Sequence, residues 1–403
     1  MWWLPIYVCL TIIFIYLLFS TLYLLYLVIA YLIVNDQQVN KAGKINKFAI
    51  LVPAHNEELL IAGLCKSLLE INYPDNMYKV FIVADNCDDK TSDICRSFGV
   101  HVLERRDISL IGKGYAISWA LQHIQLTEHD AVFIVDADNI VDPLILEELN
   151  ILINNGEKAL QCYNSVRNRE DSWFTQLLFV SRTISNLLYH QAKYKLGLSS
   201  YLMGNGLCFT SQLLQQRGWE AFSAGEDWEY YAGLVNDHIK IGFAVKAKVF
   251  HQESRSLNQA TSQRLRWSSG RFHIAKKLGL PLFVKGLLNR DWFTLDASLP
   301  LVFPNFSLQL NLTLFTLILS LFLPDTLIKL VLIYGCICLF LGQFFVFVIG
   351  IFLSGSVWEV LRAVLHVPRF LIWKMVIDIL TITGIYKGKK WVRTDRHISP
   401  SDE

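Results

Sequence analysis

Carboxylate and amide side chains stand directly after three short apolar runs of the sequence. The three polar segments are Pro53-Ala54-His55-Asn56-Glu57-Glu58, Asp85-Asn86-Cys87-Asp88-Asp89 and Asp136-Ala137-Asp138. Carboxylate oxygens suit Mg²⁺ or Mn²⁺, which proteins often hold by one or two carboxylates together with substrate phosphates. If the segments lie together, they predict a site for an anionic ligand bound through a divalent cation. For each segment alone, the alternative is that its Asn and Asp side chains cap a helix or set a turn.

Two later segments add an acid pair and a cation–aromatic pair. Glu226 and Asp227 stand where a helix is expected to begin, and Gln263, Arg266 and Trp267 form a Gln-x-x-Arg-Trp motif. A positioned carboxylate can take a proton from a hydroxyl group, and a planar guanidinium matches phosphate oxygens. The alternatives are acids that only compensate a helix dipole and a surface helix with one apolar face.

The region from residue 48 to about 275 must position these side chains, and it alternates strand-like and helix-like patterns. The expected strands are Phe48–Val52, Val80–Val83, Val100–Leu103 and Val132–Val135, and the expected helices lie near Glu58–Leu69, Asp89–Phe98 and Tyr115–Gln122. This alternation predicts an α/β fold with a mostly parallel sheet and helices on both faces. Ligands in such sheets bind beyond the carboxyl ends of the strands, so the polar segments should meet at one edge.

The rest of the chain is strongly apolar. Of the 403 residues, 53% are hydrophobic and 18% are charged, whereas about a quarter are charged in a typical soluble protein. About 20 apolar residues cross the hydrocarbon core as a helix. We therefore expect a transmembrane anchor at residues 1–35 and two transmembrane helices within 299–353, near Leu299–Leu323 and Thr326–Leu353. The first stretch lacks the basic start and the small-residue cleavage site of a signal peptide, so it is expected to remain as an anchor.

Basic residues predict the orientation of the chain. One cluster follows the first span and another follows the last: Lys41, Lys44 and Lys47, then Lys387, Lys389, Lys390, Arg393 and Arg396. The positive-inside rule places the catalytic region 36–275 and the basic tail 387–403 in the cytoplasm of an integral inner-membrane protein. The connector 276–298 and the amphipathic segment 354–386 are expected at the membrane interface; a fourth span is the alternative for the latter.

Charge and cysteine usage exclude some classes. The 37 Lys and Arg residues nearly balance the 35 Asp and Glu residues, for a net charge of +2. The chain therefore lacks the excess of positive charge that is typical of nucleic-acid-binding proteins. The eight cysteines include no Cys-x-x-Cys pair, which argues against a zinc site and a disulfide framework.

Taken in order, these motifs resemble those of the membrane-embedded family 2 glycosyltransferases. The signature consists of Asp85, Asp136-x-Asp138, Glu226-Asp227 and Gln263-x-x-Arg266-Trp267. The family includes hyaluronan, cellulose, chitin-oligosaccharide and poly-N-acetylglucosamine synthases as well as ceramide glucosyltransferases. The resemblance covers nearly the whole chain and implies a GT-A nucleotide-sugar-binding domain.

The resemblance also implies roles in binding the donor. Asp85 would contact the uracil or ribose of a UDP-sugar, in a pocket also lined by Pro53, Asn56 and Glu57. Asp138 would ligate Mg²⁺ or Mn²⁺ on the diphosphate, with Asp136 beside it. Arg266 would bind the pyrophosphate.

Further roles concern the acceptor and the reaction. Asp227 would be the general base, with Glu226 as its neighbour, and Trp267 would stack on the acceptor sugar. The acceptor site would also include Gln263 and a loop that resembles the family's acceptor loop, Gly204-Asn205-Gly206. The segment that contains Trp391, Arg393 and Thr394 resembles a gate over bound nucleotide; its alternative is a basic juxtamembrane tail.

These expectations lead to one main hypothesis and two alternatives. The main hypothesis is an inverting glycosyltransferase that moves a sugar from a UDP-sugar to a growing β-linked polysaccharide, alone, as a homo-oligomer or with an export partner. The first alternative is transfer of one sugar to a membrane lipid acceptor. The second is a membrane scaffold or receptor that binds nucleotide-sugars without turnover.

Overall fold

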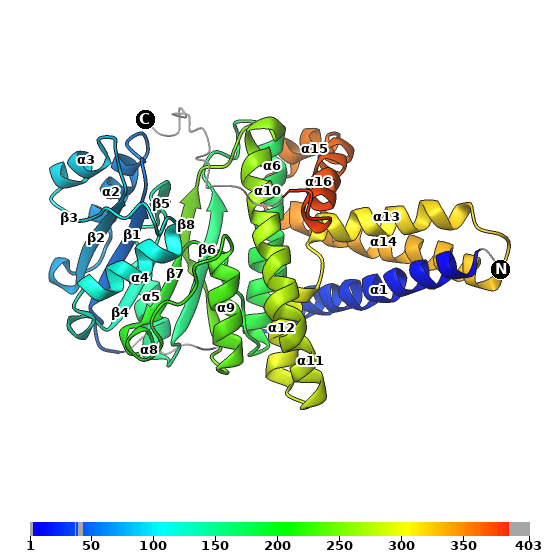
Figure 1. Cartoon of the computed structure of the whole chain (residues 1–403), viewed down its shortest axis with the longest axis horizontal. Coiled ribbons are helices and arrows are strands. Elements are labelled where there is room, and N and C mark those ends of the chain that lie inside the picture. Colours follow the sequence, from blue (N-terminus) through cyan, green and yellow to red (C-terminus); the bar gives the residue numbers. More distant parts are fainter. Residues whose placement is uncertain (1–2, 37, 39–42, 387–403) are drawn as a thin grey trace.

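The computed structural model describes residues 3–36, 38 and 43–386. Figure 1 shows three parts in a row: an α/β domain, a layer of helices beside it, and a bundle of long helices that extends away from the domain toward the N-terminus. The predicted gate at Trp391, Arg393 and Thr394, like the whole tail 387–403, lies outside the described residues.

The α/β domain contains one sheet of eight strands in the order β3-β2-β1-β4-β7-β6-β8-β5. The bounds are β1 Phe48–Ala54, β2 Tyr78–Asp85, β3 His101–Arg105, β4 Ala131–Ile134, β5 Asn139–Val141, β6 Ala159–Val166, β7 Leu207–Thr210 and β8 Ile241–His251. Strands β3, β2, β1 and β4 are parallel, whereas β7 is antiparallel to both of its neighbours. The central strands are almost continuously apolar because both of their faces are covered. This confirms the predicted mostly parallel α/β fold.

Helices cover both faces of the sheet and give it two cores. One core contains side chains of α2 Ile61–Leu69, α3 Thr91–Ser97 and α5 Ile145–Asn154. The other contains side chains of α4 Lys113–His123, α8 Ser211–Arg217 and α9 Glu226–Asn236, and it extends to α11 Leu280–Leu288 and α12 Trp292–Val302. The expected strands and helices are thus present, with ends that differ by a few residues.

Strand β8 and the helix behind it are irregular. Cys162 of β6 pairs with Ala244 but Tyr163 pairs with Lys248, so residues 245–247 bulge out of the ladder. Helix α6 Trp173–Thr183 continues into the π-helical turn η3 Ile184–Gln191 and the short α7 Ala192–Lys195. Both irregularities contribute to the wall of one cavity.

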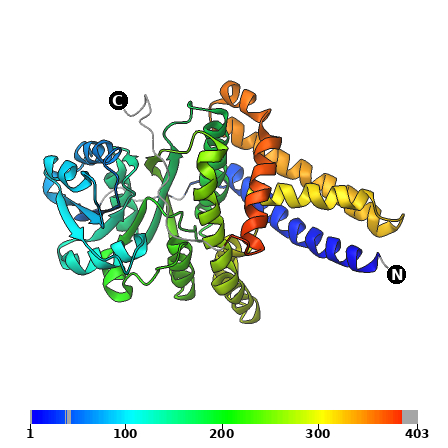
Figure 2. The same cartoon turned by 45° about the horizontal axis from the view of Figure 1, so that its top comes forward.

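Three long helices form the projecting bundle (Figure 2): α1 Leu4–Ile33, α13 Phe306–Leu321 and α14 Leu327–Leu353. Their outward side chains are apolar and exposed, whereas polar groups lie inside. The Gln343 amide donates to the hydroxyls of Thr21 and Thr313, both at 3.0 Å, and the Gln309 amide donates to Thr21 at 2.7 Å. This inside-out arrangement is typical of helices packed in lipid. By length and composition α1 and α14 are each able to cross a membrane.

The second predicted span, Leu299–Leu323, is not one straight helix. Helix α12 ends at Val302 and α13 begins at Phe306, and the two are bent by 72°. Pro304 restricts the residue before it to an extended backbone, and Phe303 has ψ 148°. The Asn305 side chain then caps α13 by accepting a hydrogen bond from the Leu308 N–H at 2.9 Å. The bent pair counts as a third span only if both helices are taken together.

The layer between domain and bundle contains the remaining helices. Helix α10 Leu257–Ile274 continues through the π-helical turn η4 Ala275–Gly279 into α11, so the predicted connector at 276–298 includes α11 and much of α12. The predicted amphipathic segment consists of two helices, α15 Val357–Val364 and α16 Val367–Ile382. Part of its charged side faces protein: Lys374 forms a buried ion pair with Asp378 and donates to Ser268 of α10 at 3.2 Å.

Candidate active site

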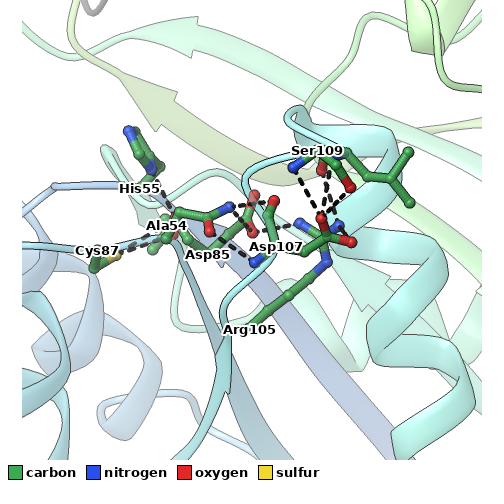
Figure 3. Close-up of polar contacts among 9 residues, drawn as sticks. Ala54, His55, Asp85, Cys87, Arg105, Asp107 and Ser109 are labelled. Atoms are coloured by element: carbon green, nitrogen blue, oxygen red, sulfur yellow. Dashed lines mark hydrogen bonds and ion pairs between the residues drawn. The ribbon is translucent and has the colours of Figure 1, made fainter.

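Asp85 lies at the carboxyl end of β2 and is held by an ion pair. Its Oδ1 atom is 2.6 Å from Nη1 of Arg105, the last residue of β3, and both side chains are buried. Figure 3 shows the side chains of Asp85 and Arg105 together. The Nη2 atom of Arg105 donates to the Leu110 carbonyl at 2.8 Å. Burial raises the pKa of the Asp85 carboxyl, and the Arg105 ion pair acts in the opposite direction. Sequence analysis missed Arg105, which fixes the orientation of Asp85.

Two asparagines in left-handed conformations join the loops around Asp85. Asn56 has φ 55° and Asn86 has φ 50°, a region that Asn tolerates better than most residues. The Asn56 side chain accepts a hydrogen bond from the Asp88 N–H, and Asn86 accepts one from the Asp107 N–H, both at 2.8 Å. Predicted donor-pocket residues Pro53, in β1, Asn56 and Glu57 thus share one sheet edge with Asp85. The Glu57 N–H donates to the Thr91 hydroxyl at 2.8 Å.

Lys113 is the second residue that sequence analysis missed, and it connects three predicted segments. Its Nζ atom is 2.5 Å from Oδ1 of Asp136 and 3.9 Å from Oε1 of Glu226. It also donates a hydrogen bond to the Gly204 carbonyl. Burial alone would lower the pKa of this ammonium, but Asp136 and Glu226 outweigh that effect and raise it.

A sequence signal for Lys113 existed in the glycines on both sides of it. Gly112 has φ 141°, where the chain enters α4. A Cβ atom on Gly114 would lie 2.0 Å from the Ala221 carbonyl oxygen. A lysine between two such glycines is held at the start of a helix, where the backbone approaches the loop that precedes α9.

The predicted acceptor loop lies against the predicted base. Gly204 and Gly206 have φ 78° and 64°, and a Cβ atom on Gly204 would be 3.1 Å from Oδ2 of Asp227. The Asn205 side chain accepts a hydrogen bond from the Asp136 N–H at 3.2 Å. The buried Gln161 side chain braces the loop because it accepts from the Met203 N–H at 2.7 Å and donates to the Asn205 carbonyl at 2.8 Å.

Glu226 and Asp227 form the first turn of α9, and their charges interact. Burial and, after it, the neighbouring charge of Glu226 together raise the pKa of Asp227 to about 7. Burial also raises the pKa of Glu226, against the opposing effect of Lys113. The third acid of this turn, Glu229, has a structural role, since it accepts hydrogen bonds from the Phe222 and Ser223 N–H groups.

Helix α10 places the Gln-x-x-Arg-Trp motif beside these acids through a contact between two glycines. A Cβ atom on Gly270 would be 3.0 Å from the Gly225 nitrogen, and one on Gly225 would be 3.2 Å from the Gly270 carbonyl carbon. Arg266, one turn earlier, is close enough to lower the pKa of Glu226, although burial has the larger and opposite effect. Trp267 is 38% exposed.

Arg264, inside the same motif, fixes the helix rather than facing the acid pair. It forms an ion pair with the buried Glu253 at 2.5 Å and lies over the Trp267 ring, 4.6 Å from its centre. Burial alone would raise the pKa of Glu253, but Arg264, His251 and Arg182 hold it well below its usual range. Gln263 is partly exposed on α10.

Asp136 and Asp138 have the donor chemistry of a divalent metal site. Both follow β4, and Asp138 directly precedes β5. Among the described residues no cluster of three or more His, Cys, Asp or Glu side chains forms a complete metal cage. Two carboxylates fit Mg²⁺ or Mn²⁺ that takes its other ligands from phosphates and water. The ammonium of Lys113 on Asp136 indicates that this position favours a cation.

Arg271, the next basic residue of α10, connects the site to the bend between α12 and α13. Its Nη2 atom donates to the Phe303 carbonyl at 2.7 Å and to the Pro300 carbonyl at 3.2 Å. Its guanidinium carbon is 5.5 Å from the ring centre of Trp228, which follows Asp227 in α9.

The α/β domain matches a known protein family. The family model described as "Glycosyltransferase like family 2" matches residues 46–270. A probable glycosyltransferase of Bacillus subtilis is 23% identical over 240 residues, which are 57% of this chain and 56% of the relative. A beta-monoglucosyldiacylglycerol synthase of Nostoc is 26% identical over 235 residues, 57% of this chain and 49% of the relative. The chain spans about half the length of these curated relatives.

The fold itself has a solved counterpart. A mannosyltransferase of Pyrobaculum calidifontis, solved with GDP-Man and Mn²⁺, superposes with a TM-score of 0.56 at 16% identity. The likeness covers 87% of this chain and 99% of that one. It therefore extends beyond the sheet to the helices that follow it.

Proposed function

Because the chain belongs to the family 2-like glycosyltransferases, we propose that it is a sugar transferase with a UDP-sugar as donor. It transfers a single sugar to a lipid acceptor at the membrane. The observation that carries the proposal is the cluster around Lys113, where Asp136, the Gly204 loop and Glu226 meet. Residues that are far apart in sequence, and that we propose for donor binding and for the acid pair, thus meet around one ammonium group.

On the donor side, cationic groups would stabilise the leaving diphosphate. Lys113 and Arg266 supply an ammonium and a guanidinium beside the acid pair, and fixed cations of this kind stabilise developing negative charge. Asp136 and Asp138 would hold Mg²⁺ or Mn²⁺, which when bound supplies further neutralisation of the diphosphate. Asp85, Asn56, Glu57 and Pro53 would line the pocket for the nucleoside.

On the acceptor side, Asp227 would act as the general base. A pKa of about 7 suits proton transfer near neutral pH, because a base works best when its pKa lies near the operating pH. Asp227 lies against the Gly204 loop, so the acceptor hydroxyl would be held between loop and carboxylate. Attack from the face opposite the diphosphate inverts the anomeric centre and gives a β-linked product from an α-linked donor. Trp267, with Gln263 beside it on α10, would offer an apolar face to the acceptor.

The long helices favour the lipid acceptor, which was the first alternative from the sequence, over the main hypothesis of a growing polysaccharide. Thr21, Gln309 and Gln343 fill the centre of the bundle with mutual hydrogen bonds, which leaves side chains where a polymer would have to pass through one protomer. The similarity to beta-monoglucosyldiacylglycerol synthases supports the same choice. We place the catalytic domain in the cytoplasm on the basis of the basic clusters.

The deciding experiment uses the full chain in lipid vesicles with a panel of UDP-sugars and either Mg²⁺ or Mn²⁺. We expect UDP release that depends on added diacylglycerol, and a product that carries one sugar by mass spectrometry. Long glycan formed without a lipid acceptor would support the polysaccharide hypothesis instead. Donor binding without any UDP release would favour the scaffold or receptor.

A further inference from the structure

A cavity lies apart from the candidate active site. Its volume is about 570 Å³, and its walls come from the end of β6, the bulge of β8, α6 and η3. None of the residues that line it belongs to the cluster around Lys113. The β8 bulge carries Lys246 into its wall, since residues 245–247 are displaced from the ladder.

The cavity is basic and partly aromatic. Four cationic side chains line it and no acidic residue does: Arg167, Arg169, Lys246 and Lys248. Two of them lie over aromatic rings, with Lys248 Nζ 5.9 Å from the centre of Tyr163 and the Arg169 guanidinium 5.3 Å from that of Phe179. We call this site the basic cavity.

Few carboxylates neutralise three of these cations, Arg169, Lys246 and Lys248. Within the part of the chain that the structure describes, Lys246 and Lys248 form no ion pair and are exposed. Arg169 approaches only its neighbour Glu170, at 3.6 Å, and that carboxylate is 73% exposed. Arg169, Lys246 and Lys248 line one cavity with so little compensation that they repel one another, so an anion in the basic cavity would relieve the repulsion.

The wall formed by α6 and η3 also contacts the helix bundle. Val180 and Leu188, which directly follow the cavity residues Phe179 and Leu187, pack in one cluster with Val28 of α1. The same cluster contains Val346 of α14. The basic cavity therefore lies at the end of the bundle nearest the catalytic domain. A bilayer that surrounds the bundle would have its lipid headgroups near this end.

We propose that the basic cavity binds the phosphate-bearing headgroup of an anionic membrane lipid. Lys and Arg match phosphate oxygens, and a basic residue near an anionic leaflet contributes about 1 kcal/mol to membrane attraction. Tyr163 and Phe179 suit the same depth, since amphipathic aromatic rings gather at membrane interfaces. The proposal concerns a site separate from sugar transfer, so it stands or fails independently of the proposed function.

The test measures lipid retained by the purified full chain in detergent, using native mass spectrometry with phosphatidylglycerol or phosphatidylcholine added. We expect the wild type to retain phosphatidylglycerol selectively. The exposed pair Lys246→Gln/Lys248→Gln should weaken retention at least about tenfold, from about 1 kcal/mol for each lost cation. Inorganic phosphate at the same concentration should not displace the lipid.

A matched variant, Lys276→Gln/Lys277→Gln, removes the same charge from two exposed residues of η4. It should retain phosphatidylglycerol like the wild type. If both double variants weaken phosphatidylglycerol retention equally, the effect is general charge attraction. If Lys246→Gln/Lys248→Gln leaves retention unchanged, the basic cavity is not the lipid site. Displacement by inorganic phosphate would overturn the lipid assignment. Lys246→Gln alone repeats the test should the double variant unfold.

Discussion

At the residue scale, Asp227 has the surroundings that a catalytic base needs. It is held by the first turn of α9 and by the close approach of Gly204. We expect Asp227→Asn to lower kcat by about 10²–10⁴-fold, because the amide keeps the shape but cannot take the proton. Binding of UDP, measured by calorimetry, should persist. The control is Glu220→Gln, an exposed acid on the loop before α9, which should leave both quantities unchanged; normal turnover in Asp227→Asn would remove its assignment as the base.

The raised pKa of Asp227 also predicts a pH dependence. A base must be deprotonated in the free enzyme, so kcat/KM should rise with pH and level off above the pKa of about 7. The rise follows the ionised fraction of one carboxyl group. A profile recorded from about pH 5 to 9 checks this, and a rate already constant from pH 5 upward would contradict the shifted pKa.

A metal prediction belongs to Asp138. Asp138→Asn should weaken UDP binding in the presence of Mn²⁺, because the neutral amide is a poorer ligand for a hard cation. Binding without metal should be nearly unchanged. Calorimetry with and without Mn²⁺ measures both, with Asp142→Asn, a carboxyl on the turn after β5, as the matched control. Equal weakening in both conditions would indicate a structural role instead.

Residue types and spacing were sufficient to predict much of this site, but not the groups that hold it together. Asp136, Glu226 and the Gly204 loop come together as the motifs suggested. The position of Lys113 in the site was not predicted because a lone lysine before an apolar helix has the pattern of a surface residue. Arg105 was not predicted because its partner Asp85 is 20 residues away. Only the register of two parallel strands brings the two residues side by side.

At the element scale, the contact between α9 and α10 depends on Gly225 and Gly270. Alanine inside an exposed helix normally stabilises it by about 1 kcal/mol relative to glycine. We expect the opposite for Gly270→Ala, because its Cβ would be 3.0 Å from the Gly225 nitrogen and would force the helices apart. Arg266 would then move away from Glu226, and kcat/KM should fall about tenfold or more.

The comparison for this variant is Ser262→Ala, which introduces the same side chain at an exposed position of α10. It should keep full activity. Full activity in Gly270→Ala would show that the close approach of the two helices does not position Arg266.

Secondary structure could be predicted where its pattern is local. The run Phe48–Val52 predicted a strand, and β1 spans Phe48–Ala54 and is buried almost throughout. The break between α12 and α13 was missed because hydropathy continues across it. The signal lay in Phe303-Pro304-Asn305, where a proline precedes a residue that caps the next helix.

At the scale of the whole molecule, a buried ion pair joins the anchor to the catalytic domain. Lys193 of α7 lies 2.9 Å from Asp296 of α12, and the Tyr23 hydroxyl of α1 donates to the same carboxylate at 2.6 Å. Removing one partner of a buried pair costs about 3–5 kcal/mol, since the other charge remains buried. Lys193→Met should therefore lower the midpoint of thermal unfolding in detergent.

The double variant Lys193→Met/Asp296→Leu removes both charges and should recover part of that loss. A double-mutant cycle checks the coupling. Simply additive losses would mean that the pair does not contribute to the junction between anchor and domain.

Tertiary arrangement was the least predictable level. The charged residues of the segment 354–386 indicated an amphipathic helix, but periodicity does not reveal which surface a polar face contacts. Lys374 and Asp378 face α10 instead of water, because the chain folds back over the catalytic domain. Such pairing depends on residues more than 100 positions away, which no local pattern contains.

Arg271 has a mechanical consequence. One guanidinium holds the carbonyls at the bend of the broken helix and also rests on the tryptophan next to Asp227. The bend between α12 and α13 and the first turn of α9, which carries Asp227, are therefore linked through Arg271. A shift of the bend would therefore reach the tryptophan beside Asp227 through this one side chain.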